Sequence, residues 1–225
     1  MFVAGFLGNQ DSWKKVSEGW GAAIAPMSAL HTSKLRFKGD RHRNLVRRAS
    51  NLVTSSGVTP LIGSVRKTDY ADLVSESWMT KEGKIFAAWI LCFTAILVEA
   101  LKFIPEYERL EVVFERQAQY ERFAGVVCGV VGEMPEFALP NGRPKLIGCR
   151  SVDKDSTQLT QPADLLAFAL LQREKAPDGL KANVTGSILI ANPPEAMVGA
   201  LLGRDMARQI IRDTFTEVMN IEGSA

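Results

Sequence analysis

The stretch LEVVFERQAQYERFAGVVCGVVGEM, residues 110–134, decides the fold class. Its first part, LEVVFE (110–115), is β-branched and aromatic and predicts a strand, whereas YERFAGVVCGVVGEM (120–134) predicts a helix. Another strand, KLIGCRSV (145–152), and a helix that starts at Thr160 follow. This alternation of strands and helices predicts an α/β domain with a mixed sheet.

Working outward, the same patterns place the remaining elements. We expect strands at 2–8, 58–67 and 187–192, a short strand within the loop 31–40, helices at 11–25, 40–56, 69–77 and 81–103, and a helical tail after 194. The uncharged run 85–98 has fourteen residues, fewer than the roughly 20 needed to span a bilayer. It therefore predicts a core helix, whose core-facing side chains are Phe86, Ile90, Phe93 and Leu97.

Composition sets wide limits on function. The chain has 225 residues, 46% hydrophobic and 23% charged, and a formal net charge of +2, which favours a soluble globular protein and names no partner. Its three cysteines are odd in number and lie far apart in apolar surroundings, which predicts reduced core thiols rather than a disulfide framework or a zinc site. With no basic segment of a secretory signal at the N-terminus, we expect a cytoplasmic protein.

One carboxylate, Asp164, interrupts the apolar run TQPADLLAFALL (160–171). Thr160 can cap a helix and Pro162 suits its first turn, and both faces of that helix are apolar, so Asp164 is predicted to be buried. A buried carboxylate costs several kcal/mol unless it is hydrogen-bonded, paired or metal-bound. It is either catalytic or a structural group that caps a backbone or pairs with an arginine such as Arg150.

A second carboxylate, Glu115, ends the strand 110–115. In α/β sheets, ligand sites gather at the carboxyl ends of strands. Two carboxylates on adjacent elements would suit Mg²⁺ or Mn²⁺, which polarise a phosphoryl oxygen and activate water. The alternative for Glu115 is a solvated strand end that pairs with Arg116.

Positive charge concentrates in KLRFKGDRHRNLVRR (34–48), with seven Lys or Arg against one Asp, a local charge of +6 that leaves −4 for the rest of the chain. Such a cluster can bind phosphates, or it can be a solvated helix face. Its basic residues are Lys34, Arg36, Lys38, Arg41, Arg43, Arg47 and Arg48. The chain has only two histidines, so a His-rich metal site is excluded, and it has neither a P-loop nor a GxSxG motif.

Taken together, these pieces resemble a bacterial and phage family known as domain of unknown function 3800, which is RNase H-like. Members of that family open with an Asp-Glu-Ser-Gly strand, then have an apolar strand, a His motif, a strand ending in an acid before Arg-Gln, and Gln-x-Ala-Asp-Leu-Leu-Ala. The matching stretches are FVAGFLG (2–8), HTSKL (31–35), FERQAQYE (114–121) and QPADLLAF (161–168), of which the last two are the most specific.

The resemblance implies an RNase H-like domain at residues 1–173 with a loop and helical extension at 174–225. It implies that Glu115 and Asp164 hold Mg²⁺ or Mn²⁺, that His31 is a nearby catalytic residue, and that the reaction is hydrolysis of nucleic-acid phosphodiesters. The expected partner is nucleic acid, positioned by the cluster 34–48, and no membrane. The alternative is a non-catalytic nucleic-acid-binding or protein-interaction domain of the same fold.

The resemblance departs at its start, because Met1 stands where the Asp-Glu-Ser-Gly strand would already have ended. The first acid and a central strand are then missing, either by truncation or by degeneration. A sheet without that strand exposes unpaired backbone groups along its neighbour. We therefore expect the chain as written to be poorly stable and to show little or no Mg²⁺-dependent nuclease activity.

Overall fold

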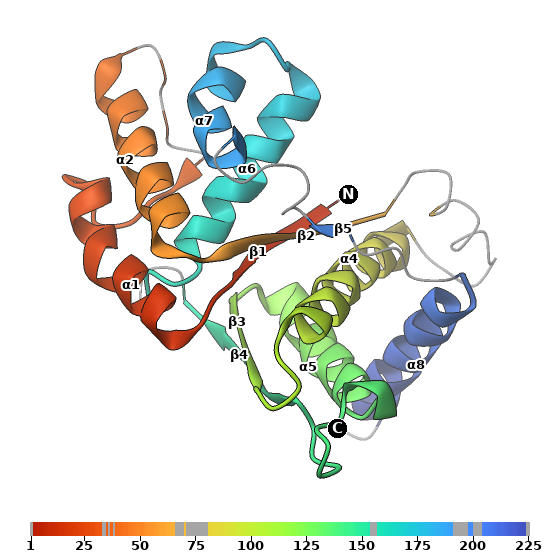
Figure 1. Cartoon of the computed structure of the whole chain (residues 1–225). Helices are drawn as coiled ribbons and strands as arrows, with labels where there is room; N and C mark the ends of the chain where they lie inside the picture. The colour runs from red at the N-terminus through yellow and green to blue at the C-terminus, as the bar shows by residue number, and fades with distance from the viewer. Residues whose placement is uncertain are drawn as a thin grey trace. The chain divides into compact units, whose positions relative to one another are not determined.

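Figure 1 shows the computed structural model of the chain. It describes residues 2–32, 35, 37, 39–65, 70, 81–153, 157–190, 198–199 and 204–223. The helix expected at 69–77, apart from Tyr70, lies outside the described residues, as do three basic residues of the cluster, Lys34, Arg36 and Lys38.

Helices make up most of the described chain. They are α1 (Gln10–Ile24), α2 (Asp40–Ser56), α4 (Lys81–Phe103), α5 (Ala118–Gly132), α6 (Gln161–Lys175), α7 (Leu180–Ile190) and α8 (Arg204–Gly223), with a 3-10 turn, η2, at Pro135–Phe137. The strands are β1 (Phe2–Leu7), β2 (Thr59–Ser64), β3 (Leu110–Glu115), β4 (Leu146–Val152) and β5 (Val198–Gly199). They form one sheet in the order β1-β2-β5 and one parallel pair, β3-β4, so the predicted mixed α/β class is confirmed.

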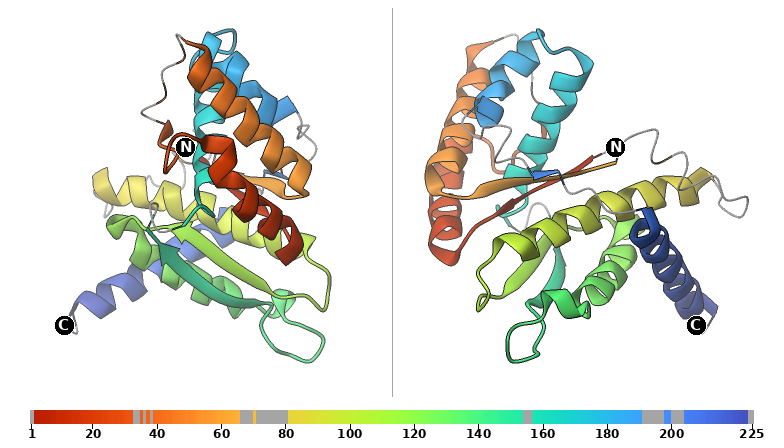
Figure 2. Two further views of the ribbon diagram at one scale, coloured as in Figure 1. Left: turned by 90° about the vertical axis from the view of Figure 1, so that its left-hand side faces the viewer. Right: turned by 45° about the vertical axis from the view of Figure 1, so that its right-hand side comes forward.

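Packing divides the chain into two compact units whose segments alternate along the sequence. One comprises Met1–Val3, Ile62–Val152 and Gly199–Ala225, and the other Ala4–Leu61 and Asp153–Val198. In the first unit α8 packs on α4 and α5, and in the second α7 packs on α2 and α6, as the ribbons in Figure 1 and Figure 2 show. The domain boundary at residue 173 expected from the sequence stays a prediction. The helical extension contributes to both units.

Helix α4 is the centre of the first unit, and it begins and ends at the predicted residues. Ile90, Phe93 and Leu97 are buried, whereas Phe86 is half-buried and stacks on Phe123 of α5 with 4.8 Å between ring centroids. The stretch Gly83–Phe103 is long and apolar enough to cross a membrane, and 67% of the 18-residue apolar segment within it is buried inside the protein.

Aromatic rings join α4 to its neighbours in this unit. Trp89 stacks on Tyr120 at a centroid distance of 4.8 Å, and Phe93 meets Phe114 of β3 edge-on at 6.0 Å. Phe123 in turn meets Phe215 of α8 edge-on at 5.5 Å. Aromatic pairs of this kind contribute about 0.5–1.5 kcal/mol each beyond the apolar area that they bury. They fix α4, α5, α8 and β3 as one core.

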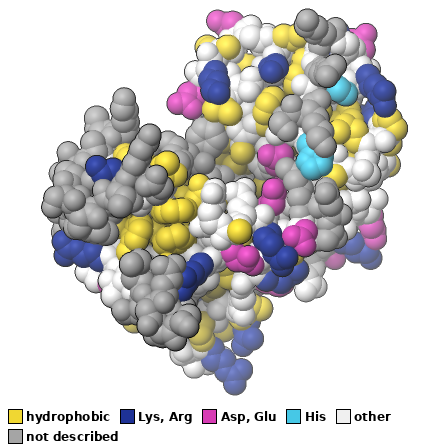
Figure 3. Space-filling view, turned by 180° about the vertical axis from the view of Figure 1, so that it is seen from behind, with side chains coloured by type: hydrophobic (Ala, Val, Ile, Leu, Met, Phe, Trp, Pro, Cys, Tyr) yellow, Lys and Arg dark blue, Asp and Glu magenta, His cyan; other side chains and the backbone are white. Residues whose placement is uncertain are grey.

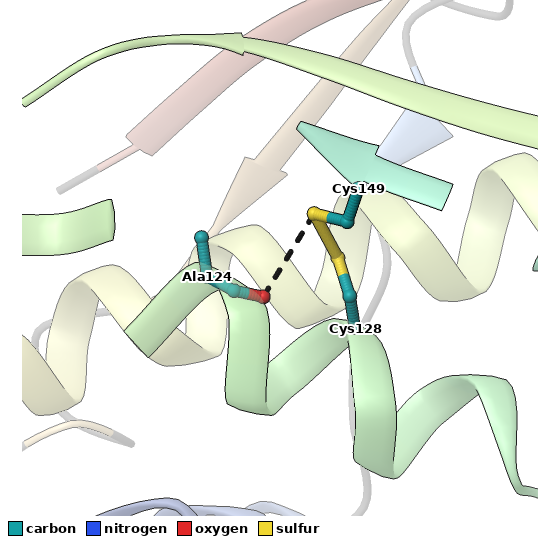
Figure 4. The surroundings of a disulfide bond; sticks show 3 residues. All are labelled: Ala124, Cys128 and Cys149. Carbon is teal, nitrogen blue, oxygen red and sulfur yellow. Dashed lines mark hydrogen bonds between the residues drawn. A yellow bond between two sulfur atoms is a disulfide. The ribbon is translucent and has the colours of Figure 1, made fainter. Parts of the chain in front are cut away.

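The cysteines differ from expectation. Cys128 of α5 and Cys149 of β4 form a disulfide, with their Cα atoms 6.3 Å apart, and Cys149 Sγ lies 3.9 Å from the carbonyl oxygen of Ala124 (Figure 4). The prediction of three reduced thiols is wrong here, because α5 packs on β4 and brings together two cysteines that are 21 residues apart. Cys92 lies outside this disulfide and has no exposed surface, and burial raises the pKa of its thiol to about 11.

In the second unit α1 packs on α2, and α7 packs on both α2 and α6. Asn9 caps α1, because its side chain accepts a hydrogen bond of 2.9 Å from the backbone N–H of Ser12. Helix α2 ends at Gly57, whose φ of 90° lies in the left-handed region that favours glycine. The fully buried side chains of these helices include Val16, Trp20, Ile24, Leu45, Val46, Val53, Leu165 and Leu166.

Two expected strands are not found. The apolar residues 187–190 continue helix α7, in which Val184 and Ile188 are buried one turn apart. A short β-branched run reads alike as a strand or as part of a buried helix, so periodicity could not separate the two. The described residues between 31 and 39 form turns rather than a short strand.

Candidate functional site

Gln161, the first residue of α6, organises the region around the predicted catalytic carboxylate. Its side chain is 1% exposed, and its Oε1 atom accepts two hydrogen bonds of 2.8 Å, one from Trp20 Nε1 and one from the backbone N–H of Leu30. Its Nε2 atom donates to the carbonyl oxygen of Thr157 at 3.4 Å. The amide thus ties α1 and the chain after α1 to the first turn of α6.

Asp164, about one turn further along α6, accepts a hydrogen bond from another segment of the chain. The Thr32 hydroxyl donates to Oδ2 of Asp164 at 3.1 Å. Asp164 is half-buried rather than buried, because only the side of α6 with Leu165, Leu166 and Ala169 faces the core. The apolar sequence of this helix overstated its burial. A carboxylate that is both hydrogen-bonded and within reach of solvent can bind a cation or a substrate.

Thr160 carries a buried hydroxyl just before the first turn of α6. It stands one turn before Asp164, whose backbone N–H donates to the Thr160 carbonyl at 3.2 Å. Thr160 is 5% exposed, and its hydroxyl oxygen has no hydrogen-bond partner among the described residues. A buried hydroxyl without a partner indicates a place for a bound water, ion or ligand atom.

His31 lies in the loop between Leu30, which Gln161 holds, and Thr32, which contacts Asp164. It is half-buried, and both histidine side chains of the chain are visible at the surface in Figure 3. The structure therefore brings the predicted residues His31 and Asp164 into one region of the second unit. They come from the two stretches HTSKL and QPADLLAF.

Glu115 belongs to the first unit, where it ends β3 opposite Val152 at the end of parallel β4. It is half-buried. The two units are each described by themselves, so a shared site of Glu115 and Asp164 stays a prediction. Arg150, considered as a partner for Asp164, instead pairs with Glu111 across the strands at 2.7 Å.

Sequence analysis missed a polar cluster next to Glu115. Ser151 of β4 donates to the Glu121 carboxylate, and Arg116 lies 3.4 Å from the Ser151 hydroxyl and 3.7 Å from Glu121. These residues meet at the carboxyl ends of two parallel strands and the start of α5. Arg116 and Ser151 are 35 positions apart, and the sequence alone did not predict that β3 pairs with β4 and brings them together.

The basic residues of α2 differ in their surroundings. Arg41 and Arg47 are exposed, whereas Arg43 pairs with Asp40 at 2.6 Å. Arg48 donates to the carbonyl oxygens of Ala23 and Ala25, at 3.1 and 2.8 Å, and so caps the end of α1. Among the described contacts of α2, such structural roles fall to Arg43 and Arg48, whereas Arg41 and Arg47 present exposed guanidinium groups.

The donors near Asp164 fit a hard cation. Its carboxylate and the Thr32 hydroxyl supply oxygen atoms, the ligand type that Mg²⁺ and Mn²⁺ prefer. Mg²⁺ keeps several waters when one or two carboxylates bind it. Within the described residues, no group of three or more His, Cys, Asp or Glu side chains could hold a metal ion. Any metal here would rely on few protein ligands.

Comparisons with protein-family models, curated proteins and solved structures give no match to this chain.

Proposed function

We propose that the chain is an RNase H-like, divalent-metal-dependent nuclease-like protein that acts on nucleic-acid phosphodiesters. One observation carries the proposal: the hydrogen bond from Thr32 to Asp164 joins the two stretches, HTSKL and QPADLLAF, that were expected to contribute to one site. They are 132 residues apart in the sequence. Thr32 lies in the loop between α1 and α2, and Asp164 lies in α6, so the fold brings these two polar side chains together.

The residues have distinct roles in this proposal. Asp164, with Glu115, would hold Mg²⁺ or Mn²⁺, which when bound polarises a phosphoryl oxygen and activates water. Thr32 orients the Asp164 carboxylate through its hydrogen bond. His31, in the same loop, carries an imidazole, the side chain that most often serves as a general acid or base in enzymes.

Binding of the substrate falls to the exposed arginines of α2. Arg41 and Arg47 lie on its exposed side, in the same unit as Asp164. Guanidinium groups bind phosphate oxygens in a bidentate manner, and neutralising phosphates releases counterions. These arginines would therefore hold the backbone of DNA or RNA without reading its sequence.

The second candidate function is binding of nucleic acid without hydrolysis. It is favoured by the lack of any group of three or more potential metal ligands among the described residues. Such a protein would need the arginines but neither a metal nor Asp164.

A cleavage assay with a matched pair of variants separates the two. Labelled single-stranded DNA, duplex DNA and RNA are incubated with Mg²⁺ or Mn²⁺, and binding is followed by fluorescence anisotropy. Metal-dependent cleavage that Asp164→Asn abolishes, and that Asp178→Asn at an exposed position of the same unit leaves intact, would support the nuclease function. Binding without cleavage, unaffected by Asp164→Asn, would instead establish the second function.

A further inference from the structure

We propose that Gln161 is the positioning residue of the Asp164 site. Its side-chain carbonyl holds the loop that carries His31 and Thr32 against the first turn of α6. The functional meaning of this role rests on the function proposed above, whereas the structural role can be tested on its own.

Gln161 is placed for this role by its burial and by its two donors. Its Oε1 atom receives Trp20 Nε1 and the backbone N–H of Leu30 at 2.8 Å each, from residues 141 and 131 positions earlier. Trp20 and Leu30 have no exposed surface, so water cannot take the place of this oxygen. A buried N–H that loses its acceptor is costly, which makes the arrangement strongly preferred over others.

The loop itself is held at its other points too. Arg48 fixes the start, by donating to the carbonyls of Ala23 and Ala25, and a turn closes after Thr32, whose carbonyl accepts from the N–H of Leu35 at 3.2 Å. Neither of these contacts reaches α6. The bond from Leu30 to Gln161 does, and it lies two residues before the bond from Thr32 to Asp164.

The chemistry of glutamine suits this position. An amide carbonyl accepts two hydrogen bonds through its two lone pairs and adds no charge to a buried site. Leucine has a similar size but no acceptor, and asparagine is one methylene shorter and withdraws the oxygen from both donors. A glutamate would bring a buried charge, which is costly.

The two donors provide a matched pair of variants. Gln161→Leu removes the acceptor, and so releases the Leu30 N–H, whereas Trp20→Phe removes the other hydrogen bond of the same oxygen and leaves Leu30 bonded. Amide hydrogen exchange of residues 30–32 is measured on metal-free protein, at a temperature where melting curves show both variants folded. Mn²⁺ affinity is then measured by titration calorimetry.

We expect Gln161→Leu to speed amide exchange at residues 30–32 at least tenfold and to weaken Mn²⁺ binding about tenfold. Trp20→Phe should lower the melting temperature but change neither the exchange rates nor the Mn²⁺ affinity. Should Gln161→Leu not fold, Gln161→Asn carries the same test. Unchanged exchange in the Gln161 variant, or equal acceleration in Trp20→Phe, overturns the positioning role.

The two readouts keep the inference apart from the proposed function. If the parent protein binds no Mn²⁺ but Gln161→Leu still releases the loop, the metal function fails and the positioning role stands. If the parent binds Mn²⁺, and Gln161→Leu binds it equally well and keeps slow exchange, the positioning role fails and the metal function stands.

Discussion

The Thr32 hydroxyl lies 3.1 Å from Oδ2 of Asp164, to which it donates a hydrogen bond across 132 residues of sequence. This bond explains how a carboxylate is accommodated in the apolar run of α6. It gives the charge a partner while the half-buried position leaves it in contact with solvent. The carboxylate therefore does not depend on a buried arginine for a partner.

Replacing Thr32 by Val tests this relationship. Val keeps the shape and removes the donor, so we expect a loss of about 1 kcal/mol in the free energy of unfolding, the usual worth of one hydrogen bond. Thr32→Ser keeps a hydroxyl and should retain most of that stability. Urea denaturation of both variants measures the difference. Equal stability of the Val and Ser variants would mean that the bond contributes nothing.

If the exposed arginines of α2 bind phosphates, nucleic-acid binding should weaken as the salt concentration rises. The double variant Arg41→Glu with Arg47→Glu should weaken binding at least about tenfold at 0.1 M salt and reduce the slope of log K against log salt by about 2. Anisotropy titrations at salt concentrations between about 50 and 200 mM measure both the affinity and this slope. The fold should survive because both side chains are exposed.

The matched control for that variant is Lys15→Glu with Lys181→Glu, which makes the same charge change at exposed positions of α1 and α7 in the same unit. A similar loss of affinity in both double variants would point to the net charge of the protein rather than to a surface on α2. Arg48 is unsuited to the test, since its bonds to the carbonyls of Ala23 and Ala25 make it structural.

Close packing of β2 on α4 makes Gly63 intolerant of any side chain. A Cβ atom at Gly63 would overlap the backbone carbonyl oxygen of Cys92, and backbone atoms of a helix cannot move aside cheaply. We expect Gly63→Ala to cost about 1–3 kcal/mol, the range for overpacking. Gly125→Ala, on an open part of α5, should instead stabilise by about 0.5–1 kcal/mol because glycine weakens helices. Thermal melts of the two variants that shift in the same direction would contradict this account.

Sequence reading succeeded where local pattern decides the structure. The long apolar run gave the bounds of α4, and the β-branched run LEVVFE gave those of β3, because each pattern is strong within one element. It failed where the decisive contact lies far along the chain. The partner of Asp164, the double acceptor Gln161 and the cysteine pair all depend on which helices and strands pack together.

Gln161 shows the limit well. The residue stood in the quoted stretch QPADLLAF, and a glutamine that opens an apolar helix reads as a solvated first turn. Only the packing of α1 and α6 reveals that it is 1% exposed and bonded to Trp20. A buried polar residue can be suspected from an apolar context, but its donors cannot be named from it.

The last prediction concerns the thiols, for which composition and structure disagree. Cys128 and Cys149 are joined, and Cys92 is buried with a pKa of about 11, so it is almost wholly protonated at pH 8 and slow to react. Alkylation followed by mass spectrometry should then label no cysteine in the native protein, one after denaturation without reductant, and all three after reduction. Reduction should lower the free energy of unfolding by about 3 kcal/mol, because a cross-link between residues 21 apart restricts the unfolded chain. Cys92→Ala is the control, since it should remove the label seen without reductant.

A cytoplasmic setting predicts reduced thiols instead. Labelling of all three cysteines in denatured, unreduced protein from rapidly quenched cells would therefore support that location and show that the bond does not form there.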